Sequence, residues 1–269
     1  AYDIFCLSRG LGDVYKRQCK HCQNADISQL PHDRGGVVPG EAITPAAIVN
    51  AAVQHRGTSI SYTYTEPTVY FEFAFDTAKL AREKGIKNVF VTNGYISPEA
   101  LREIRPYLDA ANIDLKGFTD DFYKSICGAR LQPVLDSIRL YKELGIWIEL
   151  TTLVIPGHND SEDELRRAAV FIRELGADVP WHVSRFHPTY KLTDQPRTPV
   201  DTLTRARKIG LDAGLRYVYE GNIPGEGEDT LCWKCRRPVI KRFGFTVEDL
   251  RMTEGKCGYC GATIAGVWE

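Results

Sequence analysis

The chain has 269 residues, which is enough for one α/β domain of barrel size or for a medium domain with a small module. Its 34 basic and 35 acidic residues nearly cancel, and no basic run stands out. This balance argues against a nucleic acid or an anionic membrane surface as the partner. The sequence shows neither a membrane span nor the pattern of a secretion signal, so we expect a cytoplasmic protein.

The first segment of the chain, residues 1–18, shows neither a helical nor a strand period. The chain begins at Ala1 and its only methionine is Met252, so we expect a fragment. Residues 11–18 resemble the translation of sequencing-adaptor DNA. We therefore interpret residues 1–18 as a non-native segment.

Three helix starts carry residues that cap helices. Thr44 and Ser97 each precede a proline, which favours the first position of a helix. Ser161 and Glu164 have the spacing of a capping box.

Between these helices, strand patterns recur as far as Glu220. We count five strands, and we expect a sixth before Cys19 if the set is complete. Strands that alternate with helices predict a parallel sheet with helical crossovers, either a barrel or a doubly wound sheet.

Polar residues occupy the ends of the predicted strands, where the loops of parallel α/β folds bring chemistry together. A strand period of two places Asp114 and Lys116 on one face. Because burying charges without partners is costly, we favour a charged ligand here over a structural ion pair. The strand-end residues are Glu66, Thr92, Asn93, Asp114, Lys116, Thr152, His187 and Asn222.

Each of these side chains also has a simpler interpretation. Glu66 could hold an ammonium group or cap the helix predicted from Thr68. His187 could contact a carboxylate or a nucleoside, although a single histidine is more often structural. Asn93 is a residue that a strand-ending Asn-Gly turn prefers in any case. Their convergence at one end of the sheet is the stronger indication of a binding site.

The chain has eight cysteines, which in a reducing compartment suit metal sites better than disulfides. Cys19 and Cys22 form a pair whose spacing serves zinc, redox exchange and iron–sulfur clusters alike. Cys127 stands alone, and we expect it to be a small buried side chain.

Four more cysteines form the pattern C-x2-C-x21-C-x2-C near the C-terminus. They are Cys232, Cys235, Cys257 and Cys260. Each Cys-x2-Cys pair forms a tight turn, called a knuckle. Two knuckles predict a closed tetrahedral zinc site, with rubredoxin-like iron as the alternative. So small a segment could hardly hold its fold without a metal, so we predict a zinc-ribbon-like module over residues 228–269.

Six motifs, taken in order, carry a resemblance to a known family. They are Cys19–Asn24, Tyr64–Pro67, Thr92–Tyr95, Asp114–Gly117, Arg185–Pro188 and Glu220–Gly227. As a set they resemble the radical SAM enzyme of the AmmeMemoRadiSam system, a relative of the pyruvate formate-lyase activating enzymes. The resemblance covers residues 19–269 and implies a partial (βα)6 barrel over residues 19–227.

The resemblance also implies cofactors. Three cysteines of a CxxxCxxC loop would hold a [4Fe–4S] cluster, and its free iron would bind S-adenosylmethionine. Reductive cleavage of this cofactor gives a 5′-deoxyadenosyl radical, which abstracts hydrogen from a substrate. By resemblance, Thr63, Thr65 and Glu66 lie near the methionine amino group, and Asp114, Lys116 and His187 lie along the carboxylate and ribose side, with Thr92 close by; Asn93 is a further cofactor-binding residue.

The partners are likewise implied by resemblance alone. The electron donor would be a reductase, a flavodoxin or a ferredoxin. If the likeness to activating enzymes extends to function, the hydrogen comes from a glycine of a partner protein. Companion proteins of the Memo and AMMECR types are also implied.

The chain departs from the family pattern at its first expected cluster ligand. A CxxxCxxC loop that ends at Cys19 and Cys22 needs a cysteine where Tyr15 stands, and Cys6 lies too far upstream to replace it. His21 stands where the family commonly has an aromatic residue. We favour replacement of the true N-terminus over loss of the cluster. The alternative function is a non-catalytic zinc-ribbon adaptor on a degenerate barrel.

Overall fold

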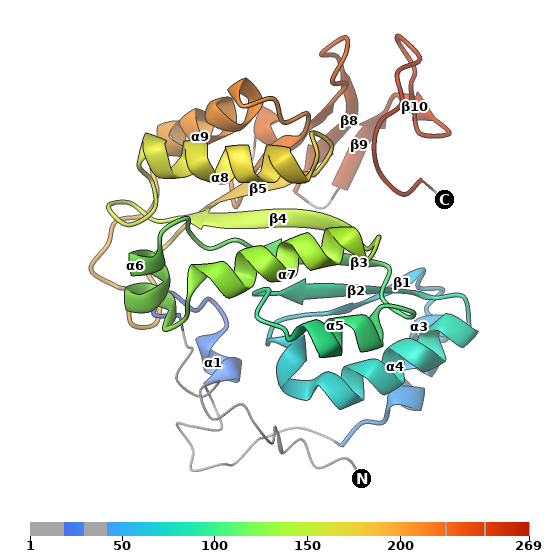
Figure 1. The fold of residues 1–269 in the computed structure, drawn as a ribbon. Helices are drawn as coiled ribbons and strands as arrows, with labels where there is room; N and C mark the ends of the chain where they lie inside the picture. Colours follow the sequence, from blue (N-terminus) through green and yellow to red (C-terminus); the bar gives the residue numbers. More distant parts are fainter. Residues whose placement is uncertain (1–18, 30–41, 224, 245, 269) are drawn as a thin grey trace. The chain divides into compact units, whose positions relative to one another are not determined.

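The structure is a computed structural model that describes residues 19–29, 42–223, 225–244 and 246–268 (Figure 1). Its main feature is a six-stranded sheet with the strands in sequence order, and the pairs β1–β2, β2–β3, β4–β5 and β5–β6 are parallel. The strands are β1 (Ser59–Tyr62), β2 (Lys87–Thr92), β3 (Ala110–Asp114), β4 (Trp147–Val154), β5 (Trp181–Arg185) and β6 (Val218–Gly221). The predicted α/β fold class is confirmed.

All six strands lie between Ser59 and Gly221, so the count of five strands was one too low. Each of the six, including the four-residue strands β1 and β6, coincides with a strand pattern of the sequence, so only the count was wrong. The strand expected before Cys19 would fall in residues 1–18, and these residues lie outside the described part of the chain. The same holds for the interpretation of residues 1–18 as non-native.

Helices alternate with these strands. They are α1 (Ala25–Ser28), α3 (Pro45–Gln54), α4 (Phe71–Glu83), α5 (Pro98–Ile104), α6 (Asp120–Phe122), α7 (Leu131–Glu143), α8 (Glu162–Leu175) and α9 (Val200–Asp212), with the 3-10 helices η2 (Pro67–Tyr70) and η4 (Glu226–Glu228) and the π-helix η3 (Tyr123–Cys127). The caps predicted at Thr44 and Ser97 are confirmed, since each hydroxyl accepts a hydrogen bond from a backbone N–H of the first turn.

The capping box predicted at the start of α8 is only half formed. The Ser161 hydroxyl accepts from the Glu164 N–H at 3.3 Å, as expected. The Glu164 carboxylate, however, accepts from the Phe118 N–H at 2.6 Å. A backbone donor far away in the sequence therefore takes the place of the local one.

The chain divides into two compact units. Among its described residues, the first unit contains β1 to β3 with α3, α4, α5 and α7. Its core follows from the two periods of strands and helices: β2 buries every second residue, including Phe90, and α7 buries Val134, Ile138 and Tyr141 at helical spacing. Complete burial of such an apolar side chain contributes about 1.5–3 kcal/mol.

The second unit contains β5, β6 and most of β4, with α8 and α9. Trp181 is completely buried, and its indole N–H donates to the Thr152 hydroxyl at 3.0 Å. A Cβ atom at Gly210 would lie 2.9 Å from the Trp181 ring, so glycine lets α9 approach the sheet closely.

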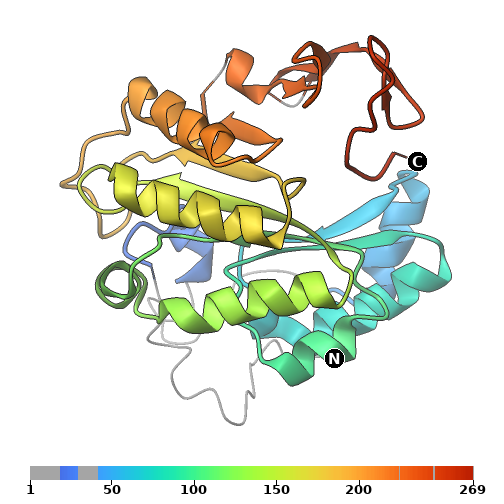
Figure 2. The ribbon, with the colours of Figure 1, turned by 45° about the horizontal axis from the view of Figure 1, so that its top comes forward.

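The C-terminal part of this second unit forms two small antiparallel sheets (Figure 2). Their strands are β7 (Thr230–Leu231), β8 (Pro238–Phe243), β9 (Thr246–Leu250), β10 (Met252–Thr253) and β11 (Lys256–Cys257). A cluster of buried side chains, including Tyr217, Val239 and Ile264, also contains Cys232 and Cys257. These cysteines are thus part of the local core.

Candidate functional site

The N-terminal cysteine pair lies on a turn in which the Cys22 N–H donates to the Cys19 carbonyl at 3.1 Å. Both side chains are half-buried. Lys20 is the first of the two residues between them. Its N–H donates to the Ile126 carbonyl and its carbonyl accepts from the Lys191 N–H, each at 2.9 Å. Backbone bonds to two distant segments therefore hold this turn.

Two side chains hold the same loop. His21 is 3% exposed, and its ring lies 6.3 Å from that of Phe122. A histidine thus makes ring contact at the position where the resemblance leads us to expect an aromatic side chain. The Asn24 amide donates to the Tyr64 carbonyl at 3.0 Å, which links the cysteine loop to the segment after β1.

The Glu66 carboxylate connects the segment after β1 with the end of β2. One oxygen accepts from the Thr92 hydroxyl at 2.7 Å and from the hydroxyl and N–H of Thr68, and the other accepts from the Asn93 N–H at 2.7 Å. Burial raises the pKa of Glu66 more than these bonds lower it. Glu66 therefore caps η2 in the structure, because its carboxylate accepts from the Thr68 N–H in the first turn of that helix.

Tyr64 was missed by sequence reasoning. It stands between Thr63 and Thr65, its φ is +72°, and its side chain is 71% exposed. A bulky residue in this conformation is strained, and such strain is often found at functional sites. No residue pattern gives this signal, since only the backbone angle reveals it.

The turn after β2 uses the side chain of Asn93 internally. The side-chain oxygen Oδ1 of Asn93 accepts from the Tyr95 N–H at 2.8 Å, as in an Asx turn. Gly94 has a φ of +73°, and a Cβ atom there would lie 2.8 Å from Ile113. The structure thus brings Glu66, Thr92 and Asn93 together in the first unit.

Asp114 is the last residue of β3, and Lys116 follows two positions later. Both are partly buried, whereas Ile113 and Leu115 are completely buried, which fits the two faces predicted from the strand period. The Lys116 carbonyl accepts from the Asn159 amide at 2.7 Å. That backbone contact fixes the position of Lys116 in the second unit.

Asn159 was also missed as a site residue. It is 1% exposed, it accepts from the Ile155 N–H at 2.6 Å, and it donates to the carbonyls of Lys116 and Leu153. One buried amide thereby joins the loop after β4 to the segment after β3. The available signal was a polar residue after Pro156-Gly157, in a loop that follows a strand.

A pocket of about 180 Å³ lies at the ends of β5 and β6 in the second unit. Its lining residues are Arg185, Phe186, His187, Arg197 and Asn222. The strand-end residues His187 and Asn222 therefore share one pocket. The motif Arg185–Pro188 contains Arg185, but it was not singled out as a site residue, and Arg197 was missed because it is in a loop and not at a strand end.

The four C-terminal cysteines converge. Their sulfur atoms all lie within 4.8 Å of one another, with Cys232–Cys260 at 3.6 Å and Cys235–Cys257 at 3.7 Å. Four thiolates around zinc at about 2.3 Å would be about 3.8 Å apart, so this donor set fits a tetrahedral metal. Among the described residues, this is the only such group of three or more potential ligands.

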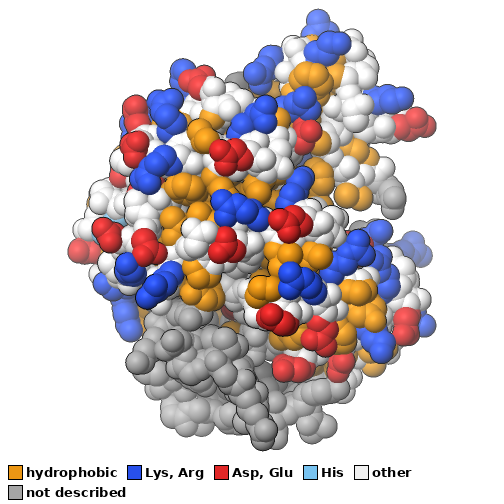
Figure 3. Space-filling model, viewed as in Figure 1, with side chains coloured by type: hydrophobic (Ala, Val, Ile, Leu, Met, Phe, Trp, Pro, Cys, Tyr) orange, Lys and Arg blue, Asp and Glu red, His pale blue; other side chains and the backbone are white. Residues whose placement is uncertain are grey.

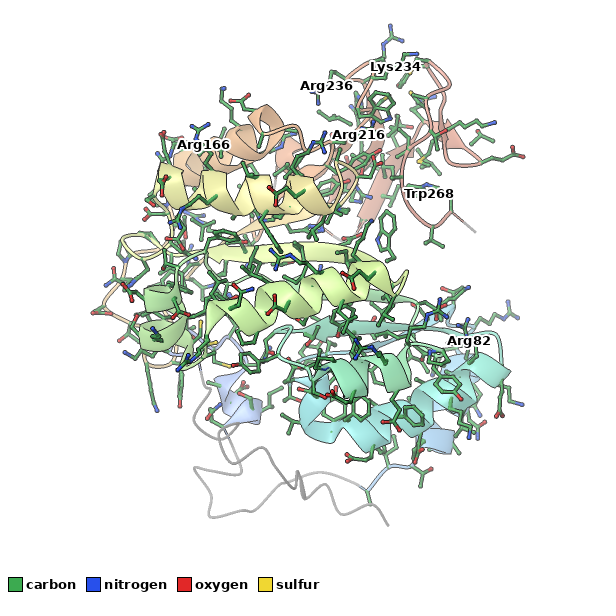
Figure 4. The ribbon with its side chains drawn as sticks, in the orientation of Figure 1. Arg82, Arg166, Arg216, Lys234, Arg236 and Trp268 are labelled. Atoms are coloured by element: carbon green, nitrogen blue, oxygen red, sulfur yellow. The ribbon has the colours of Figure 1, made fainter. Side chains whose placement is uncertain are left out.

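The two knuckles have the same local geometry. The Arg236 N–H donates to the Cys232 carbonyl and the Gly261 N–H donates to the Cys257 carbonyl, both at 2.9 Å. Arg236 and Gly261 also share a positive φ, +61° and +70°. Figure 4 shows Arg216 beside the first knuckle, where its guanidinium lies 4.1 Å from the centre of the Trp233 ring.

Comparison with known proteins identifies the family. Residues 16–169 match the description "Radical SAM superfamily". The chain belongs to the radical SAM superfamily. It is 49% identical over 251 residues to an uncharacterized protein, MJ0808, of Methanocaldococcus jannaschii, which covers 92% of this chain and 74% of that protein. It is also 21% identical to the pyruvate formate-lyase-activating enzyme of Clostridium pasteurianum, over 76% of this chain and 87% of that enzyme.

Solved structures of radical SAM proteins share the fold. A domain of pyruvate-formate lyase-activating enzyme from Bacteroides vulgatus has a TM-score of 0.53 at 20% identity, covering 61% of this chain and 98% of that one. A radical SAM methyltransferase from Sphaerobacter thermophilus has a TM-score of 0.57 at 17% identity, covering 76% and 64%. At these identities the likeness concerns the fold alone.

The superfamily implies a [4Fe–4S] cluster and S-adenosylmethionine. Cys19 and Cys22 supply two thiolates of suitable spacing, and Tyr15, at the third expected position, lies outside the described residues. The donor set of this chain therefore fits the cluster only in part. No helix of the described segments combines the length and the apolar character needed to cross a bilayer.

Surface charge on the face shown in Figure 3 is mixed, with basic and acidic side chains interspersed. The prediction that the chain binds no nucleic acid stays a prediction.

Proposed function

We propose that the protein, with its cluster loop complete, is a radical SAM enzyme of the AmmeMemoRadiSam type. The contact that carries this proposal is the hydrogen bond from Asn24 to the Tyr64 carbonyl. It ties the cysteine loop to the strand-end segment that Glu66 joins to Thr92 and Asn93. The cluster and S-adenosylmethionine would supply a 5′-deoxyadenosyl radical that abstracts hydrogen from the substrate.

The chain's own residues would bind and orient the cofactor. In this proposal, Glu66 orders the strand ends and adds a negative charge near the methionine ammonium group. Its carboxylate accepts four hydrogen bonds and accordingly acts mainly through the groups that it fixes, together with Thr63 and Thr65 beside it. Lys116 would bind the carboxylate, and Asp114 and His187 would bind the ribose side.

The partners belong to the same proposal. The likeness to activating enzymes favours a protein substrate and an electron donor such as a reductase, a flavodoxin or a ferredoxin. Memo-type and AMMECR-type proteins are proposed companions on the basis of the sequence motifs alone.

We infer further that the C-terminal cysteines hold Zn²⁺ as a closed structural site. All four ligands are thiolates from two matching knuckles, which leaves no open position for a substrate. Metal analysis of protein purified without added metal tests this inference. One zinc per chain is the expected result, and a rubredoxin-like iron spectrum would contradict it.

A second candidate function is a non-catalytic adaptor on a barrel that has lost its cluster. The observation in its favour is Tyr15 at the position of the first cluster ligand, in a chain whose C-terminal metal ligands are complete.

Anaerobic reconstitution separates the two functions. Tyr15→Cys, placed in a loop grafted from the relative that is 49% identical, is loaded with iron and sulfide and reduced with dithionite in the presence of S-adenosylmethionine. We expect a cluster absorbance band and 5′-deoxyadenosine. The control carries Cys19→Ser and Cys22→Ser in the same graft and should show neither. Absence of a cluster in the restored loop would rule out the enzyme.

A further inference from the structure

The pocket at the ends of β5 and β6 has an unusual lining. Three of its five residues are Arg185, Arg197 and His187, and no acidic side chain lines it. Its volume of about 180 Å³ is enough for a small anionic group with part of the molecule that carries it.

One wall of this pocket is rigid. Arg185 Nε donates to the Thr198 carbonyl at 2.7 Å, which fixes the guanidinium and leaves its other N–H groups available. Thr198 is itself completely buried, donates its hydroxyl to the Val154 carbonyl at 2.6 Å, and accepts from the Phe186 N–H at 2.9 Å. The Asn222 amide donates to the Arg185 carbonyl at 3.1 Å.

Two side chains of the lining, Arg197 and His187, are exposed to solvent. Among the described residues, neither Arg197 nor His187 takes part in a hydrogen bond or an ion pair. The guanidinium groups of Arg185 and Arg197 carry like charges, and no acid of this lining compensates them. An anion would compensate these charges.

The donor geometry indicates which anion. A guanidinium group presents paired N–H donors that match the two oxygens of a carboxylate or a phosphate. Arg185 is fixed in advance, so little side-chain freedom is lost when it binds such a group. Arg197 lies between β5 and α9, and its exposed side chain can adapt to the ligand.

We propose that this pocket binds an oxyanion, either a carboxylate or a phosphate group, mainly through Arg185 and Arg197. The pocket does not depend on the iron–sulfur cluster, so this inference stands or falls separately from the proposed radical chemistry. Because the proposed function assigns the carboxylate of S-adenosylmethionine to Lys116, we assign the oxyanion of this pocket to the substrate, and this assignment alone rests on the proposed function.

Calorimetric titration with inorganic phosphate at constant ionic strength tests the pocket. We expect saturable binding to the protein as it stands, and Arg197→Gln should weaken it about tenfold or more. Arg197→Lys keeps the charge without the paired donors and should recover part of the affinity. The matched control is Arg166→Gln, an exposed arginine on α8 (Figure 4).

The outcomes separate clearly. Equal phosphate affinity in Arg197→Gln and Arg166→Gln, or no saturable binding at all, would overturn the proposal. If the pocket binds phosphate, S-adenosylmethionine is added as a competitor, with 5′-methylthioadenosine, which lacks the carboxylate, as its control. No competition by either compound supports a substrate oxyanion, whereas competition by S-adenosylmethionine would overturn that assignment.

Discussion

The chain uses the same Cys-x2-Cys spacing at both ends, but the two regions differ in what surrounds the thiolates. At the N-terminal end, Cys19 and Cys22 lie half-buried on a turn that is held by hydrogen bonds to three distant segments. At the C-terminal end, four sulfur atoms lie within 4.8 Å of one another, and Cys232 and Cys257 belong to a hydrophobic cluster.

The difference teaches how a fold separates open from closed metal sites. Hydrogen bonds position the N-terminal turn, so we predict that it keeps its place without a metal. The C-terminal segment is small, and two of the six buried residues of its cluster are cysteines, so we predict that its knuckles depend on a bound metal. The following predictions test this contrast.

The largest effect is expected from removal of a closed-site ligand. Cys232→Ser should lose the zinc and unfold the C-terminal sheets, because structural zinc contributes about 10–16 kcal/mol of apparent binding free energy. Metal content and the fluorescence of Trp233 and Trp268 measure this. Cys22→Ser should leave both unchanged, and a loss of C-terminal structure in that variant would refute the contrast.

A smaller effect is expected at the turn after β2. Gly94→Ala should lower the free energy of unfolding by about 2–4 kcal/mol, because the new Cβ meets Ile113 at 2.8 Å and the φ of +73° is unfavourable. Gly85 has the same φ with no atom within 4 Å, so Gly85→Ala should cost only about 1–2 kcal/mol. Denaturant unfolding measures both, and equal costs would show that the contact with Ile113 is unimportant.

Glu66 should affect the pH dependence of stability. Burial raises the pKa of its carboxyl above 4.5, so the folded state holds this proton to higher pH than the unfolded state does. Between these two pKa values the wild-type protein should lose stability as the pH rises, by about 1.4 kcal/mol per pH unit, relative to Glu66→Gln.

Unfolding free energies measured from pH 4.5 upwards test the effect of Glu66. Glu72→Gln, which removes an exposed charge on α4, is the control and should run parallel to the wild type. Parallel curves for the wild type and Glu66→Gln would contradict the effect of burial.

The smallest effect is expected at the tether of the N-terminal loop. Asn24→Ala removes the hydrogen bond to the Tyr64 carbonyl, which contributes about 1 kcal/mol. Amide hydrogen exchange should become about five times faster in residues 19–24 and stay unchanged in the C-terminal knuckles. Asn50→Ala, an exposed asparagine on α3, is the control. Unchanged exchange in the loop would mean that this hydrogen bond does not hold it.

Local patterns in the sequence determined the fold class and the C-terminal metal ligands. Alternating strand and helix periods, the caps at Thr44 and Ser97, and the two knuckles are local features, because each depends on residues close together in the chain. The family motifs likewise led to the radical SAM superfamily.

Only the tertiary structure decided how the strand-end residues are used. It gave Glu66 donors from two segments and placed Arg197 in a pocket with Arg185. It also gave Tyr64 its positive φ and Asn159 its three partners. These features depend on hydrogen bonds and packing between residues far apart in the chain, and such contacts leave no periodic trace in the sequence.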